Sequence, residues 1–131
     1  MIGISAYRQT SVSTGSAPQI MVALFQAAVA NMRAASAAFE RGEQKAGTVL
    51  AGKAAAIVLG LHGTLKDEVA PELCARLKEL YTFVAWRLGV AGCKLSAQHV
   101  REAERVFVPI ASAFEKAVQL SGGTASSPDQ G

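Results

Sequence analysis

Apolar residues recur at intervals of three and four along most of the chain, which is the spacing of one face of an α-helix. The pattern predicts four helices, at residues 16–41, 43–65, 69–91 and 96–120. The first is the most regular, with predicted core positions Met21, Phe25, Ala28, Met32, Ala35 and Phe39. The fourth contains Pro109, which we expect to kink that helix because proline removes one backbone hydrogen bond.

Residues typical of helix ends support these boundaries. Ser16, two residues before Pro18, and Ser96 are of the type that caps a helix N-terminus. Gly42 and Gly92 follow the first and third helices, and glycine adopts the left-handed conformation of a helix C-terminus at little cost. We therefore expect the chain to leave the first helix at Gly42 and the third at Gly92.

The second predicted helix is rich in small residues. Its predicted core positions are Leu50, Ala54, Ile57 and Leu61. Three apolar residues are predicted to lie off this face: Val49, Val58 and Leu59. A further stripe consists of Gly52, Ala56, Gly60 and Gly63. Because each glycine costs about 1 kcal/mol relative to alanine in a helix interior, the helix is predicted to be weak and bare on one side. Either a neighbouring helix or the backbone of a partner would fit against that side.

The third predicted helix and the surplus of apolar residues suggest a binding surface. The core stripe of this helix is predicted as Leu73, Leu77, Leu80, Val84, Leu88 and Ala91, with Tyr81, Phe83 and Trp86 on its flanks. Val22 and Val29 of the first helix likewise fall outside its core face. Surplus apolar residues on a small bundle form a groove for an amphipathic partner segment, unless neighbouring helices simply pack tightly there.

Short connections force successive helices to run antiparallel. The fold class is therefore all-α, an antiparallel up-down four-helix bundle. Three parts are expected: an N-terminal segment over 1–15, the bundle over 16–120, and a disordered tail over 121–131 that is rich in Gly, Ser and Pro.

Composition narrows the range of functions. The chain has 131 residues, which suits one domain, and its net charge is only +3. Its 13 Lys and Arg residues are scattered, whereas a nucleic-acid-binding protein clusters them, so we expect no nucleic-acid partner. Residues 1–16 do not resemble a signal peptide, and no run approaches the roughly 20 apolar residues of a membrane span. We therefore expect a cytoplasmic protein without stable membrane insertion.

Motifs for chemistry are few. No Glu-x-x-His pair or Cys-x-x-Cys occurs, so we expect no metal, no cofactor and no enzymatic activity. Cys74 and Cys93 are expected as buried free thiols, with a disulfide left open. His62, in Leu-His-Gly-Thr-Leu-Lys, resembles the phospho-accepting residue of histidine phosphotransfer domains, which are also four-helix bundles. Lys66 stands one position later than in that motif, so phosphotransfer is a minor alternative to an ordinary surface histidine.

Several motifs resemble those of the flagellar export chaperones of the FliS family. The early tyrosine of the family matches Tyr7, and its Ser/Thr-x-Pro motif matches residues 16–18. The most specific match lies in the third helix, at Leu77, Leu80, Tyr81, Phe83, Arg87, Leu88 and Ala91. The chain departs from the family pattern at Phe25 and Gln26, where Tyr-Asp is usual, and at Gly92, where asparagine is usual.

The resemblance implies a partner and a binding surface. Such chaperones bind the disordered C-terminal segment of flagellin, prevent its premature polymerisation and deliver it to the flagellar export gate. In the family the segment over 1–15 acts as a cap that gives way to flagellin. The expected partner-binding residues are Ile4, Tyr7, Ile20, Leu24, Ile57, Leu59, Tyr81 and Leu88, with plain core packing as the alternative for each. A same-fold chaperone for another secreted subunit is the second alternative, and the sequence leaves open whether the free protein is a homodimer.

Overall fold

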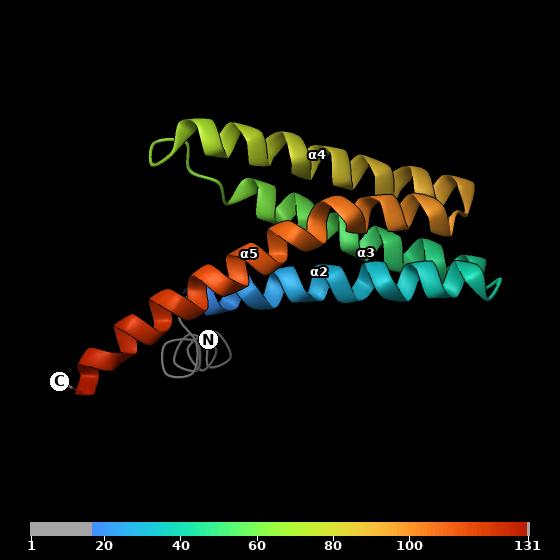
Figure 1. Cartoon of the computed structure of the whole chain (residues 1–131). Coiled ribbons are helices and arrows are strands. Elements are labelled where there is room, and N and C mark those ends of the chain that lie inside the picture. Colours follow the sequence, from blue (N-terminus) through green and yellow to red (C-terminus); the bar gives the residue numbers. More distant parts are fainter. Residues whose placement is uncertain (1–16, 131) are drawn as a thin grey trace, which may run out of the picture.

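The computed structural model describes residues 17–130, with side chains described as far as residue 121. Four helices make up this part of the chain: α2 (Ala17–Glu40), α3 (Gln44–Gly63), α4 (Pro71–Lys94) and α5 (Ala97–Gln130). They run alternately up and down (Figure 1). Helix α2 packs against α3 and α5, and α4 packs against the same two helices from the opposite side. The predicted all-α four-helix bundle is therefore confirmed.

Some predictions fall outside the described residues. The N-terminal segment with Ile4 and Tyr7, and the cap at Ser16, lie there. The predicted tail over 121–131 falls on the last turns of α5, where side chains from residue 122 onward are also outside the described part. The tail and the division into three parts therefore stay predictions.

Two helix ends share one geometry but use different residues. Gly42 has φ 79°, and its neighbour Glu43 donates its backbone N–H to Ala38 O at 2.8 Å, which ends α2 as predicted. The end of α4 was predicted wrongly at Gly92. The helix continues to Lys94, and Leu95 takes the left-handed conformation with φ 54°. Leucine is strained there because its Cβ crowds the backbone, so a leucine is not a residue from which a helix end can be predicted.

The start of α5 follows the prediction. The Ser96 hydroxyl accepts the backbone N–H of His99 at 3.2 Å, as an N-cap does. The helix then continues without interruption through Pro109. In Figure 1 its first part runs along α4, and it then crosses down toward the start of α2. One end of the bundle is therefore closed by all four helices. At the other end, α5 no longer runs beside α4.

The core is made of apolar residues from all four helices. Its largest fully buried side chains are Phe107, Met32, Leu61, Leu88, Val58, Val84 and Val100. The prediction for α2 holds at Phe25, Ala28, Met32, Ala35 and Phe39. The prediction for α3 was wrong at Val58, which is fully buried although it was placed off the core face. Leu50 and Ile57 are only half-buried, so the core face of α3 is rotated by about one residue.

Four aromatic rings join α2, α4 and α5 within this core. The Phe25 ring lies 5.6 Å from that of Phe107 and 4.9 Å from that of Phe114, both stacked. Tyr81 meets the edge of Phe25 at 6.4 Å. Aromatic pairs in these geometries add about 0.5–1.5 kcal/mol beyond the area they bury. The cluster therefore anchors α5 to α2 and α4 at the point where α5 begins to cross the bundle.

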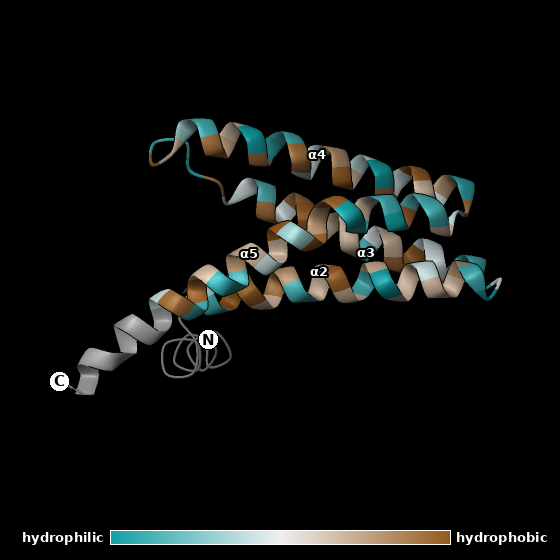
Figure 2. Cartoon of the chain, viewed as in Figure 1, coloured by the Kyte–Doolittle hydropathy of each residue, from teal (hydrophilic) through white to brown (hydrophobic). Residues whose placement is uncertain are grey.

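Helices α2 and α3 are long and apolar enough to cross a membrane by length and composition alone. Their many alanines raise the mean hydropathy without forming the continuous run of large apolar residues that the sequence lacks. Core helices of soluble proteins pass the same test, so it assigns no span by itself. Hydrophobic colours dominate both helices in Figure 2, whereas hydrophilic residues alternate with hydrophobic ones along α4 and α5.

Candidate partner-binding surface

Large apolar side chains lie exposed on several helices of the bundle. Those of the described part are Leu24, Val49, Leu59, Val69, Leu73, Leu80, Trp86, Leu95 and Leu120. Single exposed apolar residues are ordinary on a protein surface, whereas a continuous apolar face marks an interaction site. A binding surface therefore requires several of these residues to share one face.

The outer face of α3 is the most continuous of these surfaces. Val49, Ala56 and Leu59 are exposed along it, and Leu59 is 55 % exposed. A Cβ added at Gly52 or Gly60 would meet nothing within 4 Å. These two glycines are therefore not required by packing inside the bundle. They leave a bare, apolar strip, which we call the α3 outer face: Val49, Gly52, Lys53, Ala56, Leu59, Gly60 and Gly63.

The α2 side contributes a smaller apolar surface. Leu24 is 38 % exposed, and Ile20 is half-buried. Ile57 of α3 is half-buried and packs against the core. Since α2 and α3 are direct neighbours, the predicted residues Ile20, Leu24, Ile57 and Leu59 all offer at least part of their side chains at the surface of this helix pair.

Tyr81 and Leu88 were also predicted to contact the partner, but the structure places both in the core. Their exposed fractions are 3 % and 1 %. Burial raises the pKa of the Tyr81 hydroxyl to about 12, because the ionised form loses its hydration. The sequence stripe misplaced Tyr81 on a flank. A heptad spacing through Cys74, Tyr81 and Leu88 was the signal that would have found it. Their assignment to partner binding stays a prediction. In this conformation neither side chain has a surface that a partner could contact.

The start of α4 exposes a face that the sequence predicted to be core. Leu73, Leu80 and Val84 share one side of the helix. Their exposed fractions are 58 %, 38 % and 0 %, so this side emerges from the core toward the N-terminus of α4. Figure 1 shows why, because α5 has by then crossed away toward α2. The prediction of Leu73 and Leu80 as core residues was therefore wrong, and they extend the apolar surface at this end.

Trp86 lies on a separate part of α4. The side chain of Arg87 lies over its ring at 4.9 Å and over the ring of Phe83 at 5.1 Å. The same guanidinium pairs with Glu102 of α5 at 3.2 Å, while its Nε has no hydrogen-bond partner among the described residues. Cation–π contacts and the ion pair fix this side chain in place. The cluster therefore ties α4 to α5, and it leaves the outer face of Trp86 exposed.

The remaining chemical candidates show no gathered site in the described part of the chain. Within residues 17–121, no three His, Cys, Asp or Glu side chains come together as a metal site would require. His62 is half-buried in the last turn of α3. Cys74 is buried and its Sγ–H donates to Lys66 O at 3.2 Å, but Cys93 is exposed, so the expectation of two buried thiols was wrong for Cys93.

Comparison with known families assigns the chain to one of them. No individual protein of curated function matches the chain. The family described as flagellar protein FliS matches residues 3–121, which includes all four helices through the end of the described side chains. The chain therefore belongs to the FliS family of flagellar proteins.

Proposed function

We propose that this chain is a cytoplasmic export chaperone that binds the disordered C-terminal segment of flagellin, keeps it from polymerising and delivers it to the flagellar export gate. Membership of the FliS family supports the general role of a flagellar export chaperone. The flagellin segment, the gate and the cytoplasmic location are the finer parts of the proposal. No catalytic step belongs to it.

One observation carries the proposal. Helix α3 is apolar almost all round, yet much of its length is exposed in the free chain. A helix that is apolar on every side is normally buried on every side. Only Lys53 interrupts the α3 outer face with a charge. This pattern is expected if the outer face of α3 is covered when the protein works.

A helical or extended partner segment suits this surface. Because Gly52 and Gly60 carry no side chain, a partner backbone can approach α3 closely there, while Leu59 supplies an apolar contact at the edge. Removing apolar surface from water contributes about 25 cal/mol per Å². The ordering of a disordered segment offsets 2–5 kcal/mol or more of that gain. Affinity therefore depends on a long contact, which a segment wrapped over both α2 and α3 provides.

The test is titration calorimetry with the C-terminal peptide of flagellin from the same organism. We expect binding with a large negative heat-capacity change, which marks burial of apolar surface. Leu59→Ser should weaken binding about tenfold, equivalent to about 1.4 kcal/mol, because it places a hydroxyl in the apolar contact. The control is Leu95→Asn, since Leu95 is exposed at the far end of the bundle in a left-handed conformation that asparagine tolerates.

The outcomes separate the partner from the surface. No binding by the folded wild-type chain would reject flagellin as the partner. Binding that Leu59→Ser leaves unchanged would retain flagellin but reject the α3 outer face as its site. Equal weakening by Leu59→Ser and Leu95→Asn would show a general loss of structure, which circular dichroism detects directly.

A further inference from the structure

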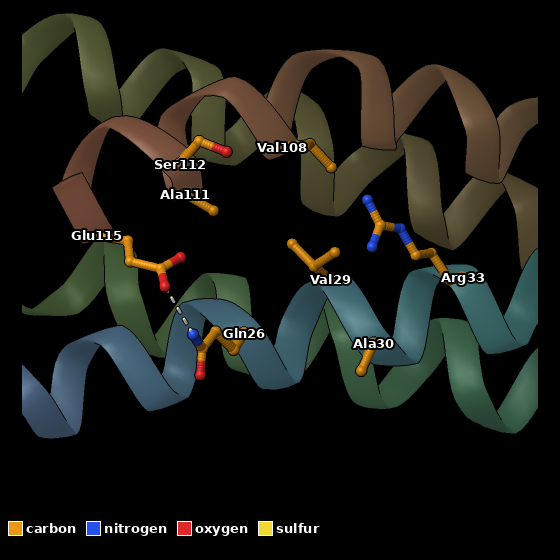
Figure 3. A pocket seen from close by; sticks show the side chains of 8 residues that line it. All are labelled: Gln26, Val29, Ala30, Arg33, Val108, Ala111, Ser112 and Glu115. Carbon is orange, nitrogen blue, oxygen red and sulfur yellow. Dashed lines mark hydrogen bonds between the residues drawn. The ribbon is translucent and has the colours of Figure 1, made fainter.

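A pocket of about 260 Å³ lies between α2 and α5, on residues that the α3 outer face does not include (Figure 3). Its apolar lining consists of Val29 and Ala30 from α2 and of Val108 and Ala111 from α5. A cavity of about 150 Å³ already holds a benzene-sized ligand. The pocket therefore has room for one branched aliphatic side chain, and it is open to the outside.

The two ends of the pocket carry opposite charges. At one end, the Arg33 side chain is 64 % exposed, and its Nε lies 3.9 Å from Glu104 Oε1, the longest ion pair among the described residues. No hydrogen bond is present at its two terminal nitrogens in that part of the chain. At the other end, Glu115 Oε2 accepts a hydrogen bond from Gln26 Nε2 at 3.1 Å, and Oε1 remains available. Both ends can therefore accept a further charged partner.

The spacing of these ends matches a helix. Gln26, which holds Glu115, and Arg33 are seven residues apart on α2. That is two turns, or about 10 Å. A second helix lying along the α2–α5 groove would present residues at the same interval, with a residue three or four positions from each end facing the pocket.

We propose that this pocket docks an amphipathic helix of a partner protein. That helix carries an acidic residue for Arg33, a leucine or isoleucine that enters over Val29, and a basic residue for Glu115, with the two charges seven residues apart. Charge complementarity at both ends fixes the direction of the helix, because the reversed helix would bring like charges together. The inference does not rest on the proposed function, and its surface is separate from the α3 outer face.

The probe is a pair of designed helical peptides of about 20 residues. One carries Glu, Leu and Lys at relative positions 1, 4 and 8, and the other carries Glu at both charged positions, so that it cannot form both pairs in either direction. With isotope-labelled full-length protein, we expect the first peptide to bind in the millimolar range or tighter and to shift the amide signals of Val29 and Ala111. The peptide with two Glu residues should bind up to about tenfold more weakly, since in either direction one Glu replaces a favourable pair with a repulsion at Glu115.

A charge change in the protein tests the same geometry from the other side. Glu115→Lys makes both ends of the pocket basic and should reverse the preference between the two peptides. The matched control, Glu79→Lys, makes the same charge change at an exposed position on α4 and should keep the wild-type preference. Because the comparison is between peptides on one protein, reduced stability of a variant does not imitate a reversal.

The proposal is overturned if both peptides fail to bind the wild-type protein at millimolar concentration, if the two peptides bind with equal affinity, or if the preference is not reversed in the Glu115→Lys protein. Amide shifts confined to α3 or α4 would equally reject the pocket as the docking site. These outcomes are independent of the flagellin titration, which reports on the α3 outer face.

Discussion

The two ends of the bundle are built differently. At the end where α2 turns into α3 and α4 turns into α5, all four helices meet (Figure 1). Gly47 of α3 lies directly against the ring of Phe39, and Thr48 donates its hydroxyl to Gly92 O at 3.4 Å. At this closed end, small residues face inward and allow the helices to approach.

The opposite end, which holds the α3–α4 connection, is open. Here Leu73 and Leu80 emerge from the core as α5 crosses away, and Val69 in the connection is exposed. The only ion pair described at this connection joins Lys78 and Asp67, at 2.9 Å. Along α3 itself, Gly60 faces solvent where Gly47 faces a ring. The same residue type therefore closes the bundle at one end of α3 and leaves an apolar surface bare toward the other.

Alanine substitution of the two glycines tests this contrast most strongly. A Cβ at residue 47 would lie 2.5 Å from two ring atoms of Phe39, so Gly47→Ala should lower the free energy of unfolding by about 2–3 kcal/mol. Gly60→Ala should raise it by up to about 1 kcal/mol, because the added methyl meets nothing and alanine favours the helix. Urea unfolding measures both. A stabilised Gly47→Ala would contradict the tight contact at the closed end.

Gly60→Ala has a second use. If a partner backbone lies close to α3, the added methyl should weaken partner binding although it stabilises the free chain. The free energy of unfolding would then rise while the affinity for the partner falls. A substitution at a glycine that no partner contacts would leave the affinity unchanged.

The contrast between these glycines also shows what the sequence could predict. The regular repeat of α2 predicted Met32 and Phe39 correctly, because large apolar residues stand out from polar neighbours there. In α3 nearly every residue is apolar or small, so the pattern has little contrast and the predicted face missed Val58. Periodicity locates a face only where the other faces are polar.

In α4 the prediction of buried residues failed for a different reason. The leucine stripe is real as a helix face, but the path of α5 decides which part of that face is covered. That path depends on the aromatic cluster around Phe107, which joins residues far apart in the sequence. Neither the exposure of Leu73 nor the pocket between α2 and α5 is therefore readable from the pattern of one helix. Leu24 and Leu59, which were predicted to lie at the surface, are indeed exposed.

The pH dependence of unfolding tests where the core ends along α4. Tyr81 is buried beside the exposed Leu80, and burial raises the pKa of its hydroxyl from 10.0 to about 12. Below pH 10 the hydroxyl is neutral in both states. Between pH 10 and 12 the unfolded chain releases the proton first, so the free energy of unfolding should fall by roughly 2 kcal/mol over this window.

Tyr81→Phe is the control for that measurement, since phenylalanine removes the ionising group and keeps the ring. Its loss of stability over the same pH window should be smaller than that of the wild type. In a Tyr7→Phe background, Tyr81 is the only tyrosine, and its ultraviolet titration reads the pKa directly. A midpoint near 10 would place Tyr81 in contact with water and move the boundary of the core inward.

The smallest effect is expected at the closed end, where Leu95 ends α4 with φ 54°. Glycine adopts this conformation without the crowding of a Cβ, so Leu95→Gly relieves strain of about 1–2 kcal/mol. It also increases the freedom of the unfolded chain and removes a half-exposed side chain, so we expect a net rise of about 1 kcal/mol at most in the free energy of unfolding. Leu95→Ala is the matched control, because it shortens the side chain but keeps the strain, and it should not stabilise. If both variants behave alike in thermal unfolding, the left-handed turn is not a source of strain, and the closed end depends on its side-chain contacts alone.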